Sequence, residues 1–269
     1  MTSFGIIGTG SLGTTLLRAA GTYAPDIRLL AASRRASQLE KLRCEIPGLV
    51  GASLEQLAQR ADLVVLCVPP DAYLALCDRI APHLGARAIV ISVANSVSLA
   101  AIAERVRRPV VKVIPTLAHV VGRGVALVVA GPGAEAEHVD AVRGVFARFS
   151  VPMLIDARDD RVASNVAGSG IALFAALCDA FVSANAARAQ ALGRPQLDAM
   201  MAETAAAVAA LARAGHDWSD IVRATATPGG MTEAALNVLT SRFPQIAEDM
   251  VAATFARQAE IQIRKQGAP

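Results

Sequence analysis

The chain has 269 residues, of which 54% are hydrophobic and 18% are charged. This composition excludes a disordered linker, and the length allows one large domain or two smaller ones that each bury a core. The net charge of +3 is small, and no basic cluster is interleaved with aromatic residues. We therefore expect no nucleic-acid partner.

The four cysteines and four histidines show neither disulfide nor metal-ligand spacing. The cysteines lie among apolar residues, as small core residues do in a reducing compartment, and we expect no metal site. The N-terminus lacks the basic start and cleavage site of a secretory signal. Asp179 interrupts the longest helix-like apolar run before it reaches the roughly 18 residues of a membrane span. The sequence thus predicts a cytoplasmic protein with no membrane partner.

The first 157 residues alternate short apolar runs with amphipathic segments. The apolar runs are continuous, which is typical of parallel strands covered on both faces. Helices are expected between the runs, for example over 11–21 and 71–85. This alternation predicts an α/β fold with a doubly wound sheet in a domain formed by residues 1–157. Its expected strands are 4–8, 27–33, 61–68, 87–93, 109–114, 124–130 and 151–155.

The strand pattern stops near Asp159, and residues 158–269 are predicted to form a second, all-helical domain. An apolar helix over 171–182 has more apolar surface than this short domain can cover. We therefore expect a homodimer or a higher homo-oligomer. The expected helices run from 159 to Gly193 and from Pro195 to Gly215, and then over 217–225, 231–243 and 244–266.

A glycine motif follows the first expected strand and opens the first expected helix. Residues Gly8-Thr9-Gly10-Ser11-Leu12-Gly13 match the G-x-G-x-x-G pattern of a Rossmann-type dinucleotide site. The first glycine allows a tight turn, the second lets a pyrophosphate approach, and the third lets the helix pack on the strand. The start of the helix favours phosphate groups. The expected cofactor contacts in this turn are Gly8, Gly10, Ser11, Leu12 and Gly13.

The end of the second expected strand reads Ser33-Arg34-Arg35, without an acid to hold a ribose 2′-hydroxyl. A guanidinium can bind a 2′-phosphate through paired hydrogen bonds, so NADPH (NADP+) is favoured over NADH. The alternative is that both arginines only solvate a loop. Turns at the carboxyl edge of the sheet are also candidates for cofactor contacts, or else plain turns. These candidates are Val68, Pro69, Ala94 and Asn95.

Three later segments differ from ordinary connections. Residues 112–124 are an expected strand that runs into a loop. Residues 167–172 place two glycines around a serine inside a helical pattern, where each glycine costs about 1 kcal/mol relative to alanine. Residues 225–232 form a Pro-Gly-Gly turn before a helix, and the free backbone N–H groups of such a turn can bind a carboxylate. All three are candidates for ligand contact.

These segments resemble, in order and spacing, the motifs of pyrroline-5-carboxylate reductases. The matching pieces are GTGSLG, SR after the second strand, VVLCVPP, ISVANS, VIPT with GRG, GSG, and TPGG followed one residue later by T. That family reduces a cyclic imine acid, 1-pyrroline-5-carboxylate, to proline with NAD(P)H, a step of proline biosynthesis. The resemblance implies a Rossmann domain followed by a helical dimerisation domain, with a small-molecule substrate near the dimer interface.

The resemblance also implies roles for single residues. Thr232 would hydrogen-bond the imine nitrogen, and Ser169 would lie where nicotinamide and substrate meet, so both are candidate catalytic residues. Thr227 and the backbone N–H groups of Gly229 and Gly230 would hold the substrate carboxylate.

The chain departs from the family pattern around this expected pocket. The family loop M-P-N-T-P-A reads I-P-T-L-A-H here, so Thr116 takes the place of an asparagine that approaches the cofactor. His119 is a new titratable group that we expect to bind substrate, with an ordinary loop histidine as the alternative. The family's G-S-G-P-A and P-G-G-T-T read G-S-G-I-A and P-G-G-M-T. These changes around the pocket leave the identity of the substrate open.

The sequence therefore leaves three functional hypotheses. The first is NADPH-dependent reduction of 1-pyrroline-5-carboxylate. The second is a paralogous reductase that acts on another imine or carbonyl compound. The third is a nucleotide-binding sensor that retains the fold without turnover.

Overall fold

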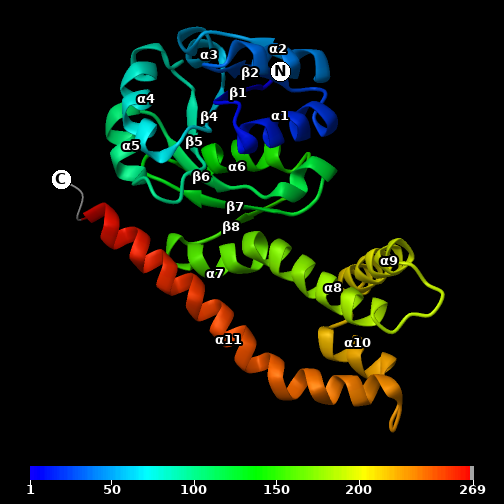
Figure 1. Ribbon diagram of the computed structural model, residues 1–269. Coiled ribbons are helices and arrows are strands. Elements are labelled where there is room, and N and C mark those ends of the chain that lie inside the picture. Colours follow the sequence, from blue (N-terminus) through cyan, green and yellow to red (C-terminus); the bar gives the residue numbers. More distant parts are fainter. Residues whose placement is uncertain (267–269) are drawn as a thin grey trace. The chain divides into compact units, whose positions relative to one another are not determined.

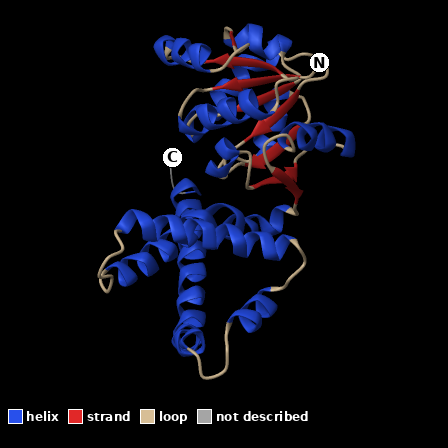
Figure 2. Cartoon of the chain, turned by 90° about the vertical axis from the view of Figure 1, so that its right-hand side faces the viewer, coloured by secondary structure: helices blue, strands red, loops and turns tan. Residues whose placement is uncertain are grey.

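The computed structural model describes the backbone of residues 1–266 and the side chains of residues 1–261. The chain divides into two compact units, Met1–Ser169 and Gly170–Pro269. The first contains the sheet and its covering helices, and the second is helical (Figures 1 and 2). Each unit is described below by itself.

An eight-stranded sheet with the order β3-β2-β1-β4-β5-β6-β7-β8 forms the centre of the first unit (Figure 1). Every expected strand is present, and the sequence did not reveal the two-residue β3. The order reverses between β1 and β4, so the crevice at their carboxyl ends is where this kind of sheet binds ligands. The strands are β1 (Ser3–Ile7), β2 (Arg28–Ala32), β3 (Val50–Gly51), β4 (Leu63–Leu66), β5 (Ile89–Ser92), β6 (Val110–Ile114), β7 (Val125–Ala130) and β8 (Val151–Leu154).

The direction of β7 departs from a wholly parallel sheet. It pairs antiparallel to β6, with Lys112 opposite Val129, and then parallel to β8. The connection between β6 and β7 contains the short 3-10 helix η3 (Leu117–Val121), and a parallel return needs a longer crossover. The loop that carries Thr116 and His119 therefore leaves the carboxyl end of β6 and turns straight back.

Helices cover both faces of this sheet and explain the continuous apolar runs. Alternate residues of a strand point to opposite faces, so Phe4 and Ile6 of β1 pack on one side and Ile7 on the other. One face is covered by α1 (Ser11–Tyr23), α2 (Ala36–Glu45) and α6 (Ala136–Phe146). The opposite face is covered by α3 (Leu54–Arg60), α4 (Tyr73–Ile80) and α5 (Leu99–Val106).

The helical segment α7 (Asp160–Ser164) of the first unit is attached to the sheet by a partly buried ion pair. Lys112 of β6 is buried and pairs with Asp160, the first residue of α7. The hydroxyl of Ser164 donates to the same carboxylate at 3.1 Å. These contacts hold α7 on the sheet, and the first compact unit extends to Ser169. The domain boundary expected at residue 157 stays a prediction.

A π-helical turn, η5 (Asn165–Ser169), follows α7. Turns with this wider hydrogen-bonding pattern are rare and are frequently found at functional sites. Gly168 lies inside the turn and Gly170 begins the next helix, so the two glycines do not interrupt a regular α-helix. The GSG segment therefore coincides with an irregular turn of the backbone. In the sequence this turn was indicated by two glycines, which are unfavourable inside a regular helix.

The second unit contains α8 (Gly170–Ala186), α9 (Arg194–Arg213), α10 (Trp218–Thr225) and α11 (Met231–Gln266). Two expected boundaries are wrong: α8 ends before Gly193, and α11 continues through Pro244. Figure 1 shows α11 changing direction partway along its length. A proline inside a helix removes one backbone hydrogen bond and bends the helix at that point.

The helices of the second unit leave most of their apolar side chains exposed. Among the hydrophobic residues described from 170 to 261, Val182 alone is buried. On α8, Phe174 is 54% exposed and Phe181 is 61% exposed. Apolar surface on this scale marks an interaction site in a folded protein.

One helical stretch, residues 157–186, is long and apolar enough to span a membrane by length and composition. The expectation that Asp179 would interrupt this run is therefore wrong, because one charge leaves the mean hydropathy high. Asp179 itself pairs with Arg194 at the start of α9. The same length and composition suit a helix whose apolar face is covered by another protein chain.

Candidate functional site

The turn between β1 and α1 needs two of its glycines for its shape. Gly8 has a φ of +103°, and a Cβ there would lie 2.2 Å from the carbonyl oxygen of Cys67. A Cβ on Gly13 would lie 1.9 Å from the carbonyl oxygen of Gly8. Gly10 differs, because no atom lies within 4 Å of the position that its Cβ would take. The first and third glycines thus let α1 pack on the turn, and the second keeps a space open.

The start of α1 presents unpaired backbone donors beside that open space. Gly10 precedes the helix, no side chain caps it, and its first turn contains no acid. The backbone N–H of Thr14 is already bonded to the Gly10 carbonyl at 2.9 Å, whereas Ser11 and Leu12 belong to the first turn, whose N–H groups have no partner within a helix. This arrangement fits the pyrophosphate of a dinucleotide.

The end of β2 is joined to the glycine turn and carries two free cations. The hydroxyl of Ser33 lies 2.6 Å from that of Thr9 and accepts the backbone N–H of Arg35 at 3.2 Å. Among the side chains described here, those of residues 1–261, neither Arg34 nor Arg35 has an ion-pair or hydrogen-bond partner for its guanidinium. Both precede α2, whose first turn contains no acid. Two cations at the positive end of a helix are unfavourable until an anion binds between them.

The turns at 68–69 and 94–95 are linked by Tyr73, which the sequence motifs do not single out. The buried phenol of Tyr73 donates to the carbonyl of Leu66 and accepts the backbone N–H of Val93 at 3.2 Å. Burial raises the pKa of Tyr73 to about 12, so the hydroxyl stays protonated. Tyr73 thus fixes the spacing of the carboxyl ends of β4 and β5, from which both turns emerge. In the sequence it looks like an ordinary apolar position of a helix.

The structure does not support the expected contact between His119 and a substrate, because the ring is not accessible to a ligand. The ring is completely buried, 5.8 Å from the ring of Phe149 between centroids. Its Nε2 accepts the backbone N–H of Thr116 at 3.1 Å, so Nδ1 carries the proton and donates to the carbonyl of Arg123 at 3.0 Å. Burial lowers the pKa of His119. The neutral ring therefore has no nitrogen left for a ligand and instead holds the β6–β7 loop together.

Thr116 is also buried in this loop. Its hydroxyl has no hydrogen-bond partner among the described residues. A Cβ on Gly124, whose φ is +84°, would lie 2.8 Å from that hydroxyl oxygen. Gly124, the second glycine of the GRG segment, thus leaves room for the Thr116 side chain. The contact of Thr116 with a cofactor stays a prediction.

In the second unit, the Pro-Gly-Gly turn between α10 and α11 uses its own backbone donors. Gly229 has a φ of +73°, and a Cβ on Gly230 would lie 2.5 Å from the hydroxyl oxygen of Thr227. The Gly230 N–H donates to the Thr227 carbonyl at 2.9 Å, and the Gly229 N–H donates to the carboxylate of Glu233 at 2.7 Å. Both amides expected to hold a substrate carboxylate are therefore occupied in this structure. The sequence motifs gave no indication of Glu233.

The two candidate catalytic hydroxyls lie on different units. Ser169 is half-buried at the end of the π-helical turn, and Thr232 is exposed in the first turn of α11. Neither hydroxyl has a hydrogen-bond partner among the side chains up to residue 261. Both are therefore available to a ligand.

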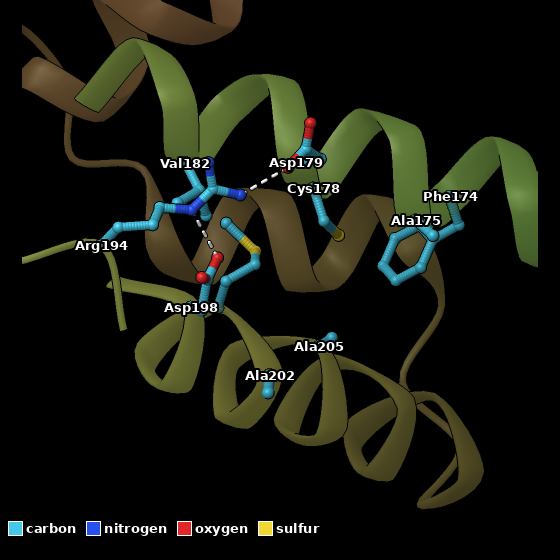
Figure 3. A pocket seen from close by; sticks show the side chains of 10 residues that line it. Phe174, Ala175, Cys178, Asp179, Val182, Arg194, Asp198, Ala202 and Ala205 are labelled. Atoms are coloured by element: carbon cyan, nitrogen blue, oxygen red, sulfur yellow. Dashed lines mark hydrogen bonds and ion pairs between the residues drawn. The ribbon is translucent and has the colours of Figure 1, made fainter. Parts of the chain in front are cut away.

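A groove of about 340 Å³ lies between α8 and α9 and contains none of the predicted site residues (Figure 3). At one end, Arg194 bridges Asp179 and Asp198, the latter at 2.8 Å. The remaining lining is apolar or small, so the groove continues the exposed apolar surface of α8. Within the described part of the chain, no cluster of histidine, cysteine and acidic residues could hold a metal ion.

Two family models match the chain, one in each half. Residues 3–96 match the family described as NADP oxidoreductase, coenzyme F420-dependent. Residues 159–261 match the family described as pyrroline-5-carboxylate reductase dimerisation. The first match contains the glycine turn and the Ser-Arg-Arg segment, and the second contains the helices with exposed apolar faces.

Curated relatives match over both halves together. The pyrroline-5-carboxylate reductase of Corynebacterium melassecola is 28% identical over 250 residues, which cover 89% of this chain and 90% of the relative. The enzyme of the same name from Pseudomonas aeruginosa is 28% identical over 264 residues, which cover 95% of each chain.

Solved structures show the same fold. A pyrroline-5-carboxylate reductase from Coxiella burnetii matches with a TM-score of 0.86, and a pyrroline carboxylate reductase from Plasmodium falciparum, solved with NADP bound, matches with a TM-score of 0.81. Each match covers 97% of this chain and 98% of the other at 20% identity. The fold of this chain, a sheet-containing unit followed by a helical unit, is thus shared with these solved structures.

Proposed function

This chain belongs to the pyrroline-5-carboxylate reductase family, and we propose that it is an NADPH-dependent reductase of a C=N bond. The first candidate substrate is 1-pyrroline-5-carboxylate, with proline as the product. The observation that carries the proposal is the dinucleotide turn, in which Gly8 and Gly13 are fixed by packing and Gly10 faces open space. The cytoplasmic location expected from the sequence stays a prediction.

The preference for NADPH rests on the arginine pair after β2. The guanidinium groups of Arg34 and Arg35 are exposed and have no described partner, and they precede a helix start that lacks an acid. A 2′-phosphate would supply the missing anion and accept hydrogen bonds from one or both groups. The bound cofactor would supply the hydride for the reduction.

We propose that the protein accelerates the reaction by positioning the substrate and by polarising its C=N bond. A free hydroxyl on Thr232 can donate a hydrogen bond to the imine nitrogen, which makes the neighbouring carbon more electrophilic. We propose that Ser169, at the end of the π-helical turn, contacts the nicotinamide end of the bound cofactor. Reduction of an imine needs a proton at nitrogen but no nucleophile from the protein, so orientation supplies much of the rate.

We propose that the active form is a homodimer or a higher homo-oligomer. The region that matches the dimerisation family is the helical unit, where α8 exposes Phe174 and Phe181. A second copy of the same helices would cover these apolar faces in a two-fold interface. Burial in such an interface also accounts for the membrane-like hydropathy of residues 157–186.

Oxidation of NADPH in the presence of 1-pyrroline-5-carboxylate, with proline identified as the product, tests this proposal. A rate well above that of the enzyme-free mixture supports it. A folded protein that binds NADPH but reduces no member of a panel of cyclic imines would instead be a nucleotide-binding sensor. Faster reduction of another imine would identify a paralogous reductase, which is the second candidate.

A further inference from the structure

A buried hydroxyl lies between the carboxyl ends of β4 and β5, where the two strands separate. The Tyr73 phenol donates to the carbonyl of Leu66, the last residue of β4, and accepts the backbone N–H of Val93 at 3.2 Å. Leu66 lies opposite Ser92 in this parallel ladder, so the Val93 N–H is the donor that the Leu66 carbonyl would meet in the next rung. The phenol therefore takes the place of one rung and holds the two strand ends apart.

This hydroxyl joins the two turns that are candidates for cofactor contact. The chain leaves β4, passes through the turn at 68–69 and returns at Tyr73, so the phenol closes that loop. On the other side, Val93 leads directly into the turn at 94–95, whose first N–H donates to the buried hydroxyl of Ser92 at 3.4 Å. One oxygen atom thus sets the distance between the two turns.

The order of the strands indicates which half of a dinucleotide would lie over these turns. The proposed pyrophosphate site follows β1, and the arginine pair proposed for the 2′-phosphate follows β2. The strands β4 and β5 lie on the opposite side of β1 from β2. A dinucleotide that crosses the sheet at this point therefore places its nicotinamide half over the ends of β4 and β5.

We propose that Tyr73 is a positioning residue for the nicotinamide half of the cofactor, which it places by setting the distance between the turns at 68–69 and 94–95. This inference rests on the proposed function, because it requires that the crevice binds a dinucleotide. Tyr73 acts through the backbone of the two turns, since its own ring is completely buried.

Contacts on the other side of β4 confine this effect to the nicotinamide half. The Cys67 N–H donates to the carbonyl of Ile7 in β1 at 2.8 Å, and the Cys67 carbonyl lies against Gly8 in the glycine turn. Loss of the phenol hydroxyl leaves these contacts in place. It frees the carbonyl and the N–H at the two strand ends, which then take up water or bond directly. In both cases the turn at 94–95 moves relative to the glycine turn.

The alternative is that Tyr73 serves only as a core residue. It belongs to the apolar cluster on the face covered by α3, α4 and α5. Burial raises the pKa of Tyr73 to about 12, so the phenol keeps its proton at neutral pH and supplies none to the reaction. A core role changes stability but not the relative affinity of ligands that occupy different halves of the crevice. A positioning role changes that relative affinity.

Two ligands that share the adenosine half separate these roles. We would measure the Kd for NADP+ and for 2′,5′-ADP, which lacks the nicotinamide half, with the full-length protein and with Tyr73→Phe. The ratio of the Kd for NADP+ to that for 2′,5′-ADP is expected to rise about tenfold, while the Kd for 2′,5′-ADP stays constant. The kcat for imine reduction should fall about 10- to 100-fold with little change in the KM for the imine.

Tyr23→Phe is the matched control, because it removes the same atom from the other tyrosine of the chain, which is exposed at the end of α1. Its Kd ratio should equal that of the unmodified protein. Thermal unfolding shows whether each variant is folded. An unchanged Kd ratio in a folded Tyr73→Phe protein would overturn the inference and leave Tyr73 as a core residue.

A second variant keeps the test decisive if Tyr73→Phe does not fold. Ser92→Ala removes a hydrogen-bond partner of the phenol and releases the first N–H of the turn at 94–95. The Kd ratio should then rise in the same direction by a smaller factor, and an unchanged ratio would overturn the inference.

The binding measurements also keep this test separate from the test of function. A protein that binds both ligands but reduces no imine contradicts the proposed reaction, and the Kd ratio still decides the role of Tyr73. A protein that binds neither ligand contradicts the proposed cofactor site and this inference together.

Discussion

The hydroxyl oxygens of Thr9 and Ser33 lie 2.6 Å apart and join the glycine turn after β1 to the end of β2. This bond fixes the turn proposed for the pyrophosphate relative to the arginines proposed for the 2′-phosphate. A site whose parts are held in place before binding spends less of its interaction energy on ordering them. The bond therefore links the two halves of the proposed NADPH contact.

Replacement of both Arg34 and Arg35 by serine should weaken NADPH binding by about 10- to 100-fold, as expected for losing charge-assisted hydrogen bonds. NADH has no 2′-phosphate, so its Kd should change little. Fluorescence titration with both cofactors measures the difference. Arg43→Ser is the control, because Arg43 lies on α2, the helix that follows the arginine pair, and is already paired with Glu40 at 2.9 Å. Equal losses for both cofactors would contradict the assignment.

Substitution of Gly13 should affect the stability of the protein, whereas substitution of Gly10 should affect the binding of NADPH. Gly13→Ala places a Cβ against the Gly8 carbonyl, and this overpacking should lower the free energy of unfolding by about 1–3 kcal/mol or more. Gly10→Ala has open space and a φ of −73° that alanine accepts, so its stability should change little while NADPH binding weakens at least about tenfold. Thermal unfolding with and without NADPH measures both effects. An unchanged Kd for NADPH in Gly10→Ala would remove that glycine from the site.

The buried ring of His119 should make stability depend on pH. Its pKa is lowered from 6.5, so below that pH the unfolded chain takes up a proton that the folded ring does not. The free energy of unfolding should therefore decrease as the pH falls from about 7 toward 5. His119→Ala should be less stable at pH 8 by roughly 2–4 kcal/mol, because it leaves a cavity and two backbone groups unpaired, and should lose part of the pH dependence. Urea unfolding at several pH values checks this, and identical pH slopes would disprove the role.

The strands of the first unit could be predicted because burial on both faces leaves a direct trace in the sequence. A continuous apolar run of four residues between turn residues, such as Leu63–Leu66, is too short for a helix and lacks the alternation of a half-exposed strand. The glycine turn could be predicted for a similar reason, since the packing of Gly8 and Gly13 excludes any side chain. Both features are local, and each is dictated by sterics within a few residues.

Features that depend on distant partners could not be predicted in the same way. Tyr73 looks like a core residue, and its hydrogen bonds to two strand ends exist only in the folded sheet. The ion pair between Lys112 and Asp160 joins residues far apart in sequence, so no local pattern indicates it. His119 looked available for chemistry because nothing in the sequence shows that the β6–β7 loop folds over its ring. Pro244 predicted a helix end that the structure replaces by a bend.

The proposed role of Thr232 predicts a loss of turnover without a loss of cofactor. Thr232→Ala should lower kcat by about 10- to 1000-fold, the range for losing a polarising or proton-donating contact, and leave the Kd for NADPH unchanged. Thr240→Ala is the control on the same helix, since the Thr240 hydroxyl donates to the Leu236 carbonyl at 2.9 Å. Steady-state rates and NADPH titrations distinguish the two variants. Equal rates would exclude Thr232 from the reaction.

The most direct test follows the hydride itself. The enzyme would be incubated with 1-pyrroline-5-carboxylate and NADPH deuterated at both C4 positions of the nicotinamide, and the proline would be analysed by mass spectrometry. The account predicts proline that carries one deuterium on the former imine carbon, in an amount equal to the NADP+ formed. Oxidation of the cofactor without labelled proline, or no oxidation by a folded protein that binds NADPH, would contradict it.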